Sequence, residues 1–236
     1  METDSNEKIV GILGLCPYAT CDFYRKILDA TPAKKDWEHI RILIDNNPKI
    51  PSRGRCLELG EADPTPFMRE AIRKLKDYGA DFVIIPCNTA HYFFEGVVTN
   101  LGVPVLNMVE ETSKYVLCKQ TGLTAIGLVA SRITTESKLF DRYFNPEGVK
   151  VMSLPKEQSH ISEIIEEVKT GNDSNSTRAE IKEIAKKLII NGAEAVIVGC
   201  TELSLLLRDG DLSVPIYDSN TILAEIAVSK AKNINT

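Results

Sequence analysis

Hydrophobic residues form short, continuous runs that alternate with stretches of helical periodicity along most of the chain. The runs 82–85 and 195–198 contain no polar residue, which is typical of strands buried on both faces of a parallel sheet. Each run follows a helical pattern that ends in a glycine, Gly79 or Gly192, a common C-terminal cap. The alternation predicts an α/β fold with parallel sheets.

The two runs belong to an internal repeat. Segment 79–89 matches segment 192–202 without a gap, so that Cys87 corresponds to Cys200. The segments 103–105 and 214–216 also match, and 9–13 resembles 125–129. One structural unit is therefore used twice. Each cysteine is predicted to lie at the carboxyl end of a parallel strand, where open α/β sheets bind ligands, and near a helix start that favours a thiolate.

The repeat predicts two pseudo-symmetric halves, each a parallel sheet of about four strands flanked by helices, with the active site in the cleft between them. We expect the first half to span residues 1–115 and the second 116–218, with a C-terminal helix at 219–234 packing back on the first half. Segment 45–66 is predicted to be a functional loop, since it is long and rich in Pro, Gly and charge. Helices are predicted at 89–100 and 135–144, and Ser219 is a candidate N-cap for the last helix.

Composition narrows the functional classes. The 236 residues are 43 % hydrophobic and carry a net charge of −5. This charge does not indicate the basic surface that nucleic-acid binding requires. No stretch approaches the roughly 18 apolar residues of a membrane helix, and the polar start of the chain is unlike a secretory signal, so we expect a cytoplasmic protein. The six cysteines are predicted to be free thiols. No metal site, P-loop or complete dinucleotide fingerprint is recognisable, so no cofactor is expected.

Two motifs resemble those of a known family. Segments 86–91 (Pro-Cys-Asn-Thr-Ala-His) and 199–203 (Gly-Cys-Thr-Glu-Leu) are similar to the signature motifs of the aspartate/glutamate racemase family. Segments 11–14 and 22–24 resemble its amino-terminal motif, and 50–53 (Ile-Pro-Ser-Arg) fits the aspartate racemase branch. The resemblance covers essentially the whole chain. It implies an isomerase that interconverts L- and D-aspartate, or glutamate, without pyridoxal phosphate, and that forms a homodimer.

The chemistry of such a reaction fits the two cysteines. Inversion of an α-carbon removes a proton from one face and delivers one to the other, and Cys87 and Cys200 can act as base and acid in either direction. Asn88, Thr89 and Thr201 are candidates for binding the α-carboxylate, because they follow the cysteines. The candidate set for substrate binding also includes Glu202, beside Cys200, and Ser131, after the predicted strand 124–130. The family implies an anchor for the side-chain carboxylate at Arg53 and Lys169.

Other interpretations remain open at this stage. Where the family's first loop reads Gly-Gly-Met-Gly-Pro, this chain has Gly-Leu-Cys-Pro at 14–17, which changes the pocket and leaves a third thiol, Cys16, nearby. A broad-specificity amino-acid racemase, a hydantoin racemase and a maleate isomerase are alternatives within the superfamily. A thiol hydrolase using Cys87 and His91 is an alternative from another class, as is a ligand-binding sensor. A cysteine at a strand end can also be a plain buried hydrophobe.

Overall fold

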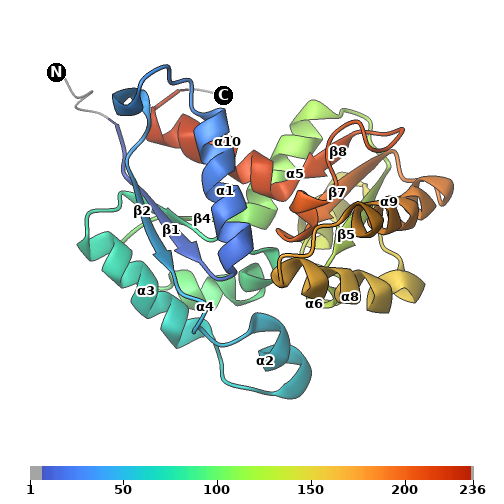
Figure 1. Ribbon diagram of the computed structural model, residues 1–236, viewed down its shortest axis with the longest axis horizontal. Helices are drawn as coiled ribbons and strands as arrows, with labels where there is room; N and C mark the ends of the chain where they lie inside the picture. Colours follow the sequence, from blue (N-terminus) through green and yellow to red (C-terminus); the bar gives the residue numbers. More distant parts are fainter. Residues whose placement is uncertain (1–6, 235–236) are drawn as a thin grey trace. The chain divides into compact units, whose positions relative to one another are not determined.

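The computed structural model describes residues 7–234 and contains two four-stranded sheets in which every strand pair is parallel (Figure 1). The first sheet has the order β2-β1-β3-β4 and the second the order β6-β5-β7-β8. The strands are β1 (Val10–Gly14), β2 (Ile42–Asn46), β3 (Phe82–Ile84), β4 (Val105–Leu106), β5 (Ala125–Ala130), β6 (Lys150–Met152), β7 (Ala195–Gly199) and β8 (Ile216–Asp218). The identical strand order shows that the repeat in the sequence is a repeat in the structure.

The chain divides into two compact units. Of the described residues, one unit contains 7–108 together with 223–234, and the other contains 109–222. The chain passes from the first to the second within helix α5 (Met108–Lys119) and returns within helix α10 (Ser219–Ala231).

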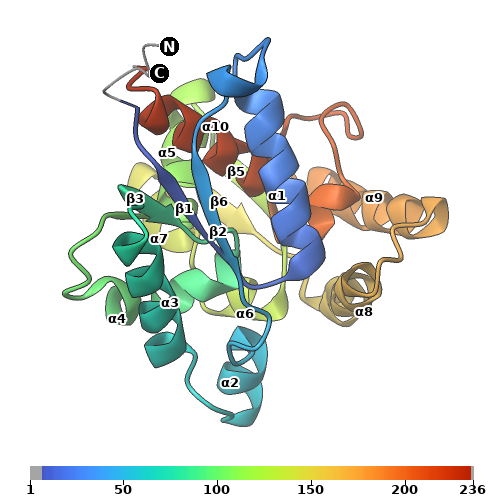
Figure 2. The same cartoon turned by 60° about the vertical axis from the view of Figure 1, so that its left-hand side comes forward.

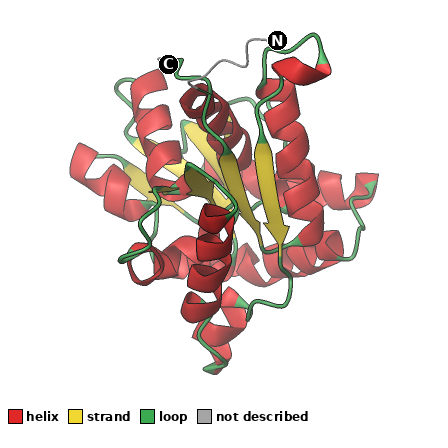
Figure 3. Ribbon diagram, turned by 90° about the vertical axis from the view of Figure 1, so that its left-hand side faces the viewer, coloured by secondary structure: helices red, strands yellow, loops and turns green. Residues whose placement is uncertain are grey.

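In the amino-terminal unit, helices cover both faces of the sheet (Figures 2 and 3). Ile12 and Ile84 pack with α1 (Pro17–Ala30) and the later turns of α10. Leu13 and Val83 face the other way, against α3 (Thr65–Asp77). The side chains of a strand alternate between the two faces, so a strand covered on both sides needs the continuous apolar run seen in the sequence. The unit also contains η1 (Asp36–Glu38), α2 (Arg53–Leu59), η2 (Asn88–Phe93) and α4 (Phe94–Val98).

The second unit is built in the same way. Val196 and Val198 pack against α8 (Gln158–Lys169) and α9 (Asn175–Ile190). Leu128 and Ile197 lie on the opposite face of the sheet, against α5 and α7 (Asp141–Phe144). The unit also contains α6 (Arg132–Glu136), η3 (Asn145–Glu147), η4 (Pro155–Glu157) and η5 (Leu203–Leu205).

A glycine in the first strand of each half lets a helix approach the sheet closely. A Cβ atom at Gly11 would lie 3.0 Å from the Cβ of Ala80 and 3.4 Å from that of Leu75. At Gly127 it would lie 3.0 Å from the Cβ of Leu188. The same contact between helix and strand therefore recurs in both halves.

We expect Gly127→Ala to destabilise the fold by about 1–3 kcal/mol, the usual cost of overpacking a well-packed core. The reason is that the new methyl group collides with Leu188 on a helix that is packed against the strand. Thermal or urea unfolding measures the change. Gly54→Ala is the matched control, because the nearest described atom to a Cβ there is the Ser52 hydroxyl, at 4.0 Å. Equal stability of the two variants would contradict this account of the contact.

Three local predictions were wrong. Segment 45–66 contains helix α2, which the sequence pattern did not reveal because it is only seven residues long; the Ser52 hydroxyl caps it by accepting from the Arg55 N–H at 3.3 Å. The helix expected at 135–144 is split into α6 and α7, with Lys138 between them at a φ of 53°. The helix expected at 89–100 is the 3₁₀ helix η2 followed by the short α4.

The cap of the last helix also differs from expectation. Ser219 is the first residue of α10, and its hydroxyl donates to the Val198 carbonyl at 2.8 Å. The preceding Asp218 accepts from the Asn220 N–H at 3.0 Å and therefore does the capping. No helix within residues 7–234 combines the length and the apolar character needed to cross a membrane.

Candidate active site

Cys87 lies three residues after the end of β3 and is the N-cap residue of η2. Its side chain is 8 % exposed and lies in the cluster that includes Leu15 and Ala90. The register of β1 with β3 pairs Ile12 with Ile84, so the loop after β1 and the Cys87 turn lie at the same edge of the sheet. That edge is the one at which parallel α/β sheets bind ligands.

Cys200 holds the equivalent position after β7 and is also 8 % exposed. The register of β5 with β7 pairs Ala130 with Gly199. Ser131, the next residue after Ala130, therefore lies beside Cys200 at the carboxyl edge of the second sheet. The Ser131 hydroxyl caps α6 by accepting from the Thr134 N–H at 3.4 Å.

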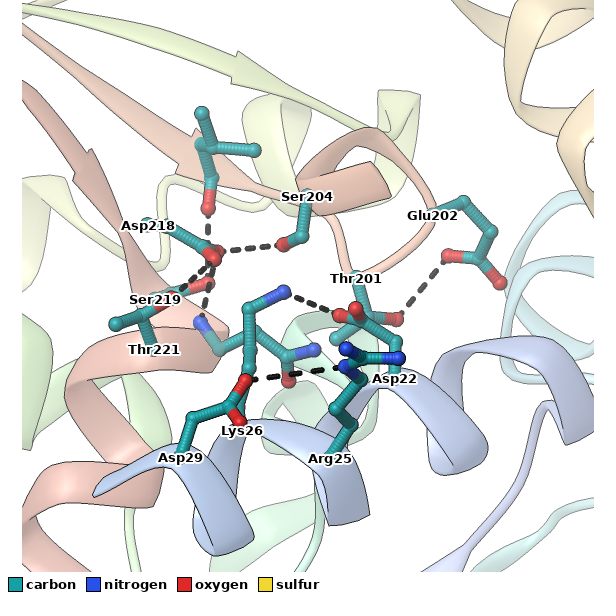
Figure 4. A network of polar contacts seen from close by, with 12 residues as sticks. Asp22, Arg25, Lys26, Asp29, Thr201, Glu202, Ser204, Asp218, Ser219 and Thr221 are labelled. Carbon is teal, nitrogen blue, oxygen red and sulfur yellow. Dashed lines mark hydrogen bonds and ion pairs between the residues drawn. The ribbon is translucent and has the colours of Figure 1, made fainter. Parts of the chain in front are cut away.

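The Cys200 thiol has a carboxylate partner. Its Sγ donates to Oε2 of Glu202 at 3.1 Å. The Thr201 hydroxyl donates to the same oxygen at 3.2 Å (Figure 4). Glu202 is 4 % exposed, and its second oxygen, Oε1, is buried without a hydrogen-bond partner among residues 7–234. A buried carboxylate oxygen without a donor is energetically costly, so this oxygen is available to a cationic or N–H-bearing ligand.

Lys169 ends helix α8 in the same unit, with its Nζ 2.6 Å from Oε1 of Glu166. Partial burial acts to lower the pKa of Lys169, but the hydrogen bond and charge of Glu166, together with the charges of Glu202 and Cys200, outweigh it and raise the pKa. The lysine is therefore cationic and lies within electrostatic reach of the Cys200 turn. Its side chain remains 42 % exposed, so it can move to meet an anionic ligand.

His91 is buried in the amino-terminal unit, where both ring nitrogens are engaged with the backbone. Nε2 accepts from the Met108 N–H at 3.0 Å, so Nδ1 carries the proton and donates to the Cys87 carbonyl at 2.9 Å. Burial lowers the pKa of His91 to about 4 against the opposing effect of its backbone hydrogen bonds, and the ring is neutral. It is not oriented as a base for the Cys87 thiol, which argues against the hydrolase interpretation.

Arg53 is the first residue of α2, and its guanidinium contacts both the segment just before that helix and Cys16. Nη1 donates to the Pro51 carbonyl at 3.2 Å, and Nη2 lies 3.6 Å from Sγ of Cys16. Cys16 follows β1 and packs beside the cluster that contains Cys87. The third thiol noted in the sequence therefore contacts the proposed carboxylate anchor.

The remaining predicted residues lie in the two cysteine turns. Asn88, the first residue of η2, is 2 % exposed, and Thr89 after it is half-buried. Thr201 is 2 % exposed beside Glu202. The amino-terminal unit thus gathers Cys87 with its neighbours and Arg53, while the second unit gathers Cys200 with its neighbours, Lys169 and Ser131. Within residues 7–234, no group of three or more His, Cys, Asp or Glu is placed to hold a metal ion.

Ser204 and Asp218 form a polar network close to Cys200, although no sequence motif pointed to them. The Ser204 hydroxyl donates to Oδ1 of Asp218 at 2.5 Å, and the Thr221 hydroxyl donates to Oδ2 at 2.7 Å (Figure 4). This network connects η5, which begins three residues after Cys200, with the start of α10. The available signal was the repeat, because Ser204 occupies the position in the second copy that His91 occupies in the first.

Known proteins resemble this chain along most of its length. A broad-specificity amino-acid racemase of Bacillus subtilis, RacX, is 28 % identical over 230 residues, which cover 94 % of this chain and 97 % of that protein. A glutamate racemase of Aquifex aeolicus is 26 % identical over 144 residues, 61 % of this chain and 54 % of that protein.

Two solved structures share both the fold and a quarter or more of the sequence. The aspartate racemase of Picrophilus torridus superposes with a TM-score of 0.86 at 27 % identity, covering 95 % of this chain and 94 % of that one. A putative Asp/Glu racemase of Yersinia pestis gives 0.78 at 26 % identity, covering 95 % and 99 %. Residues 12–227 match the family described as Asp/Glu/Hydantoin racemase, and the chain therefore belongs to that family.

Proposed function

We propose that this protein is a cofactor-independent racemase that interconverts L- and D-aspartate, using Cys87 and Cys200 as its two acid–base groups. The observation that carries the proposal is the pair of buried cysteines at equivalent strand ends of two repeated halves, in a chain of this racemase family. A reaction at one carbon that requires a proton on either face calls for two such groups, and the repeat supplies one from each half.

The proposed step moves one proton on each face of the α-carbon. The thiolate of one cysteine takes the α-proton, and the electrons of the C–H bond remain on the α-carbon. The thiol of the other cysteine then delivers its proton to the opposite face, which leaves the enantiomer and exchanges the protonation states of the two sulfurs. Near-attack placement of both sulfurs and the carbon supplies much of the acceleration.

The neighbouring residues are proposed to hold the substrate. Asn88, Thr89, Thr201 and Ser131 border the cysteines and offer amide and hydroxyl groups to the α-carboxylate. Arg53 and Lys169 are proposed to bind the side-chain carboxylate, for which a guanidinium offers a bidentate fork.

Chiral chromatography tests the proposal directly. The purified protein is incubated with L-aspartate or L-glutamate without added cofactor, and the appearance of the D enantiomer is followed. We expect D-aspartate to accumulate toward a racemic mixture. If no amino acid is racemised under these conditions, the proposal fails. Light scattering on the same preparation tests the homodimer that we propose for its assembly.

A second candidate is a racemase of broad specificity. It is favoured by the 28 % identity to the broad-specificity amino-acid racemase over 94 % of this chain, and by the Leu15-Cys16 pair in the first loop. Adding neutral and basic L-amino acids to the assay separates the two candidates. Comparable rates for alanine and aspartate would favour the broad-specificity enzyme.

Glu202 is proposed to have two tasks, one for each carboxylate oxygen. Oε2 accepts from the Cys200 thiol, and Oε1, which has no hydrogen-bond partner among residues 7–234, is proposed to accept from the α-ammonium group of the substrate. We expect Glu202→Gln to lower kcat/KM by about a hundredfold, since charge-assisted hydrogen bonds are about twice as strong as neutral ones and two are weakened. Steady-state kinetics with aspartate measures the effect.

Glu183→Gln is the matched control. It removes an equal charge from the same unit, but Glu183 is exposed and forms a surface ion pair with Lys186. Its kcat/KM should equal that of the unsubstituted protein. If the two variants behave alike, Glu202 has no role at the site.

A further inference from the structure

The backbone around Cys87 and the backbone around Cys200, called the cysteine turns, are each hydrogen-bonded through a side chain to the start of a helix that follows later in the chain. In the first half, the His91 ring spans from the Cys87 carbonyl, at 2.9 Å, to the N–H of Met108, at 3.0 Å. Met108 is the first residue of α5, and its N–H is one of those that a helix leaves without an internal partner. The ring therefore fixes the backbone of the cysteine and caps the helix at the same time.

In the second half, Ser204 makes the corresponding connection with different chemistry. Its N–H donates to the Cys200 carbonyl at 3.2 Å, and its hydroxyl donates to Oδ1 of Asp218 at 2.5 Å. The same Asp218 oxygen accepts from the N–H of Asn220, the second residue of α10, at 3.0 Å. A hydroxyl and a carboxylate thus join the cysteine turn to the helix start, as the imidazole does in the first half.

The two connections are equivalent by position. His91 and Ser204 each lie four residues after their cysteine, and both are buried. The helices that they reach, α5 and α10, are also equivalent, because they are the two in which the chain passes from one unit to the other. A repeat that preserves a connection while changing its chemistry indicates that the connection itself is needed.

We propose that His91 and Ser204 are positioning residues, each fixing one cysteine by holding its turn to the first residues of a helix in which the chain crosses between units. The inference rests on the proposed two-cysteine racemisation. The direction of each thiol depends on the backbone angles of its own residue, and both cysteines lie on short turns. A displacement of about 1 Å at a reacting group can cost on the order of a hundredfold in rate.

The test separates the two connections by leaving one working cysteine at a time. In a Cys87→Ser background only Cys200 can exchange the α-proton of aspartate with heavy water, and proton NMR measures the rate. There, Ser204→Ala should slow exchange by about tenfold or more, and Ser204→Thr, which keeps the hydroxyl, should restore it. In a Cys200→Ser background, Ser204→Ala should leave exchange by Cys87 unchanged. His91→Gln should slow exchange in the Cys200→Ser background, where Cys87 is the working cysteine, and leave it unchanged in the Cys87→Ser background.

Ser113→Ala is the matched control. Ser113 is fully buried in the same unit as Ser204, and its hydroxyl donates to the Val109 carbonyl at 2.8 Å. Its replacement removes a buried hydroxyl of the same kind without touching a cysteine turn, so exchange should be unchanged in both backgrounds. If Ser204→Ala slows both backgrounds equally, or neither, the positioning role is wrong.

A second readout does not depend on the substrate. The rate at which iodoacetamide alkylates each cysteine is followed by peptide mass spectrometry in the chain with both thiols present. Ser204→Ala should raise the rate at Cys200 relative to Cys87 by several-fold, on the order of the rate effects of a loosened reacting group. An unchanged ratio overturns the positioning role. If the unsubstituted protein racemises no amino acid, the proposed function fails. The alkylation ratio still tests whether Ser204 positions Cys200, because it requires no substrate.

Discussion

Cys87→Ser and Cys200→Ser are each expected to lower racemisation by at least about a thousandfold, because a hydroxyl at neutral pH supplies neither the base nor an acid of comparable strength. The loss should be equally deep for both variants, since each inversion uses both sulfurs in the proposed mechanism. Polarimetry or chiral chromatography with each enantiomer as the starting substrate measures it.

The two variants should differ in proton exchange. A variant that keeps the thiolate facing the α-proton of one enantiomer can still remove and return that proton without inversion. In heavy water, one variant should therefore exchange L-aspartate and the other D-aspartate, and the pattern assigns each sulfur to a face of the carbon. Cys118→Ser replaces an exposed cysteine and should leave racemisation and exchange intact. Full racemisation by either single variant would rule out the two-thiol mechanism.

The different surroundings of the two thiols also have a kinetic consequence. Cys200 donates to a buried carboxylate, whereas the Cys87 turn is held by a neutral histidine. The enantiomers have equal free energy in water, so kcat/KM must be the same in both directions whatever the surroundings. Any difference between the thiols will therefore be visible in exchange rates and in the separate kcat and KM values.

The sequence was sufficient to predict the two sheets and the equivalence of the cysteines, for a physical reason. Strands covered on both faces must be continuously apolar, so 82–85 and 195–198 could be recognised without any tertiary information. The repeat also shows that Gly11 and Gly127 occupy equivalent positions. The close helix contacts that require glycine at these positions become apparent only in the structure.

Contacts between distant residues could not be predicted in this way. Arg53 reaches Cys16 across 37 positions, and both ring nitrogens of His91 are engaged by backbone groups, the Cys87 carbonyl and the Met108 N–H. The sequence placed His91 and Glu202 close to their cysteines but gave no orientation for either side chain. The structure distinguishes the two residues, because Glu202 accepts from the Cys200 thiol, whereas the ring nitrogens of His91 bond to backbone groups.

Arg53→Ala is expected to raise KM for aspartate by about a hundredfold, because a bidentate, charge-assisted pair with the side-chain carboxylate would be lost. The guanidinium is already oriented by the Pro51 carbonyl and the Cys16 sulfur, so little ordering is needed when the substrate binds. Arg53→Lys should recover only part of the affinity, since an ammonium cannot form the same fork.

Arg55→Ala controls for the loss of an arginine from the same helix. Arg55 is exposed and pairs with Glu61, so its replacement should leave KM unchanged. Kinetics of Arg53→Ala with both aspartate and alanine then show which part of the substrate Arg53 recognises. If Arg53→Ala weakens turnover of aspartate but not of alanine, Arg53 binds the second carboxylate and selects dicarboxylic substrates. If turnover of both substrates falls equally, Arg53 supports the pocket but does not bind the substrate's side chain. That result would favour the broad-specificity enzyme.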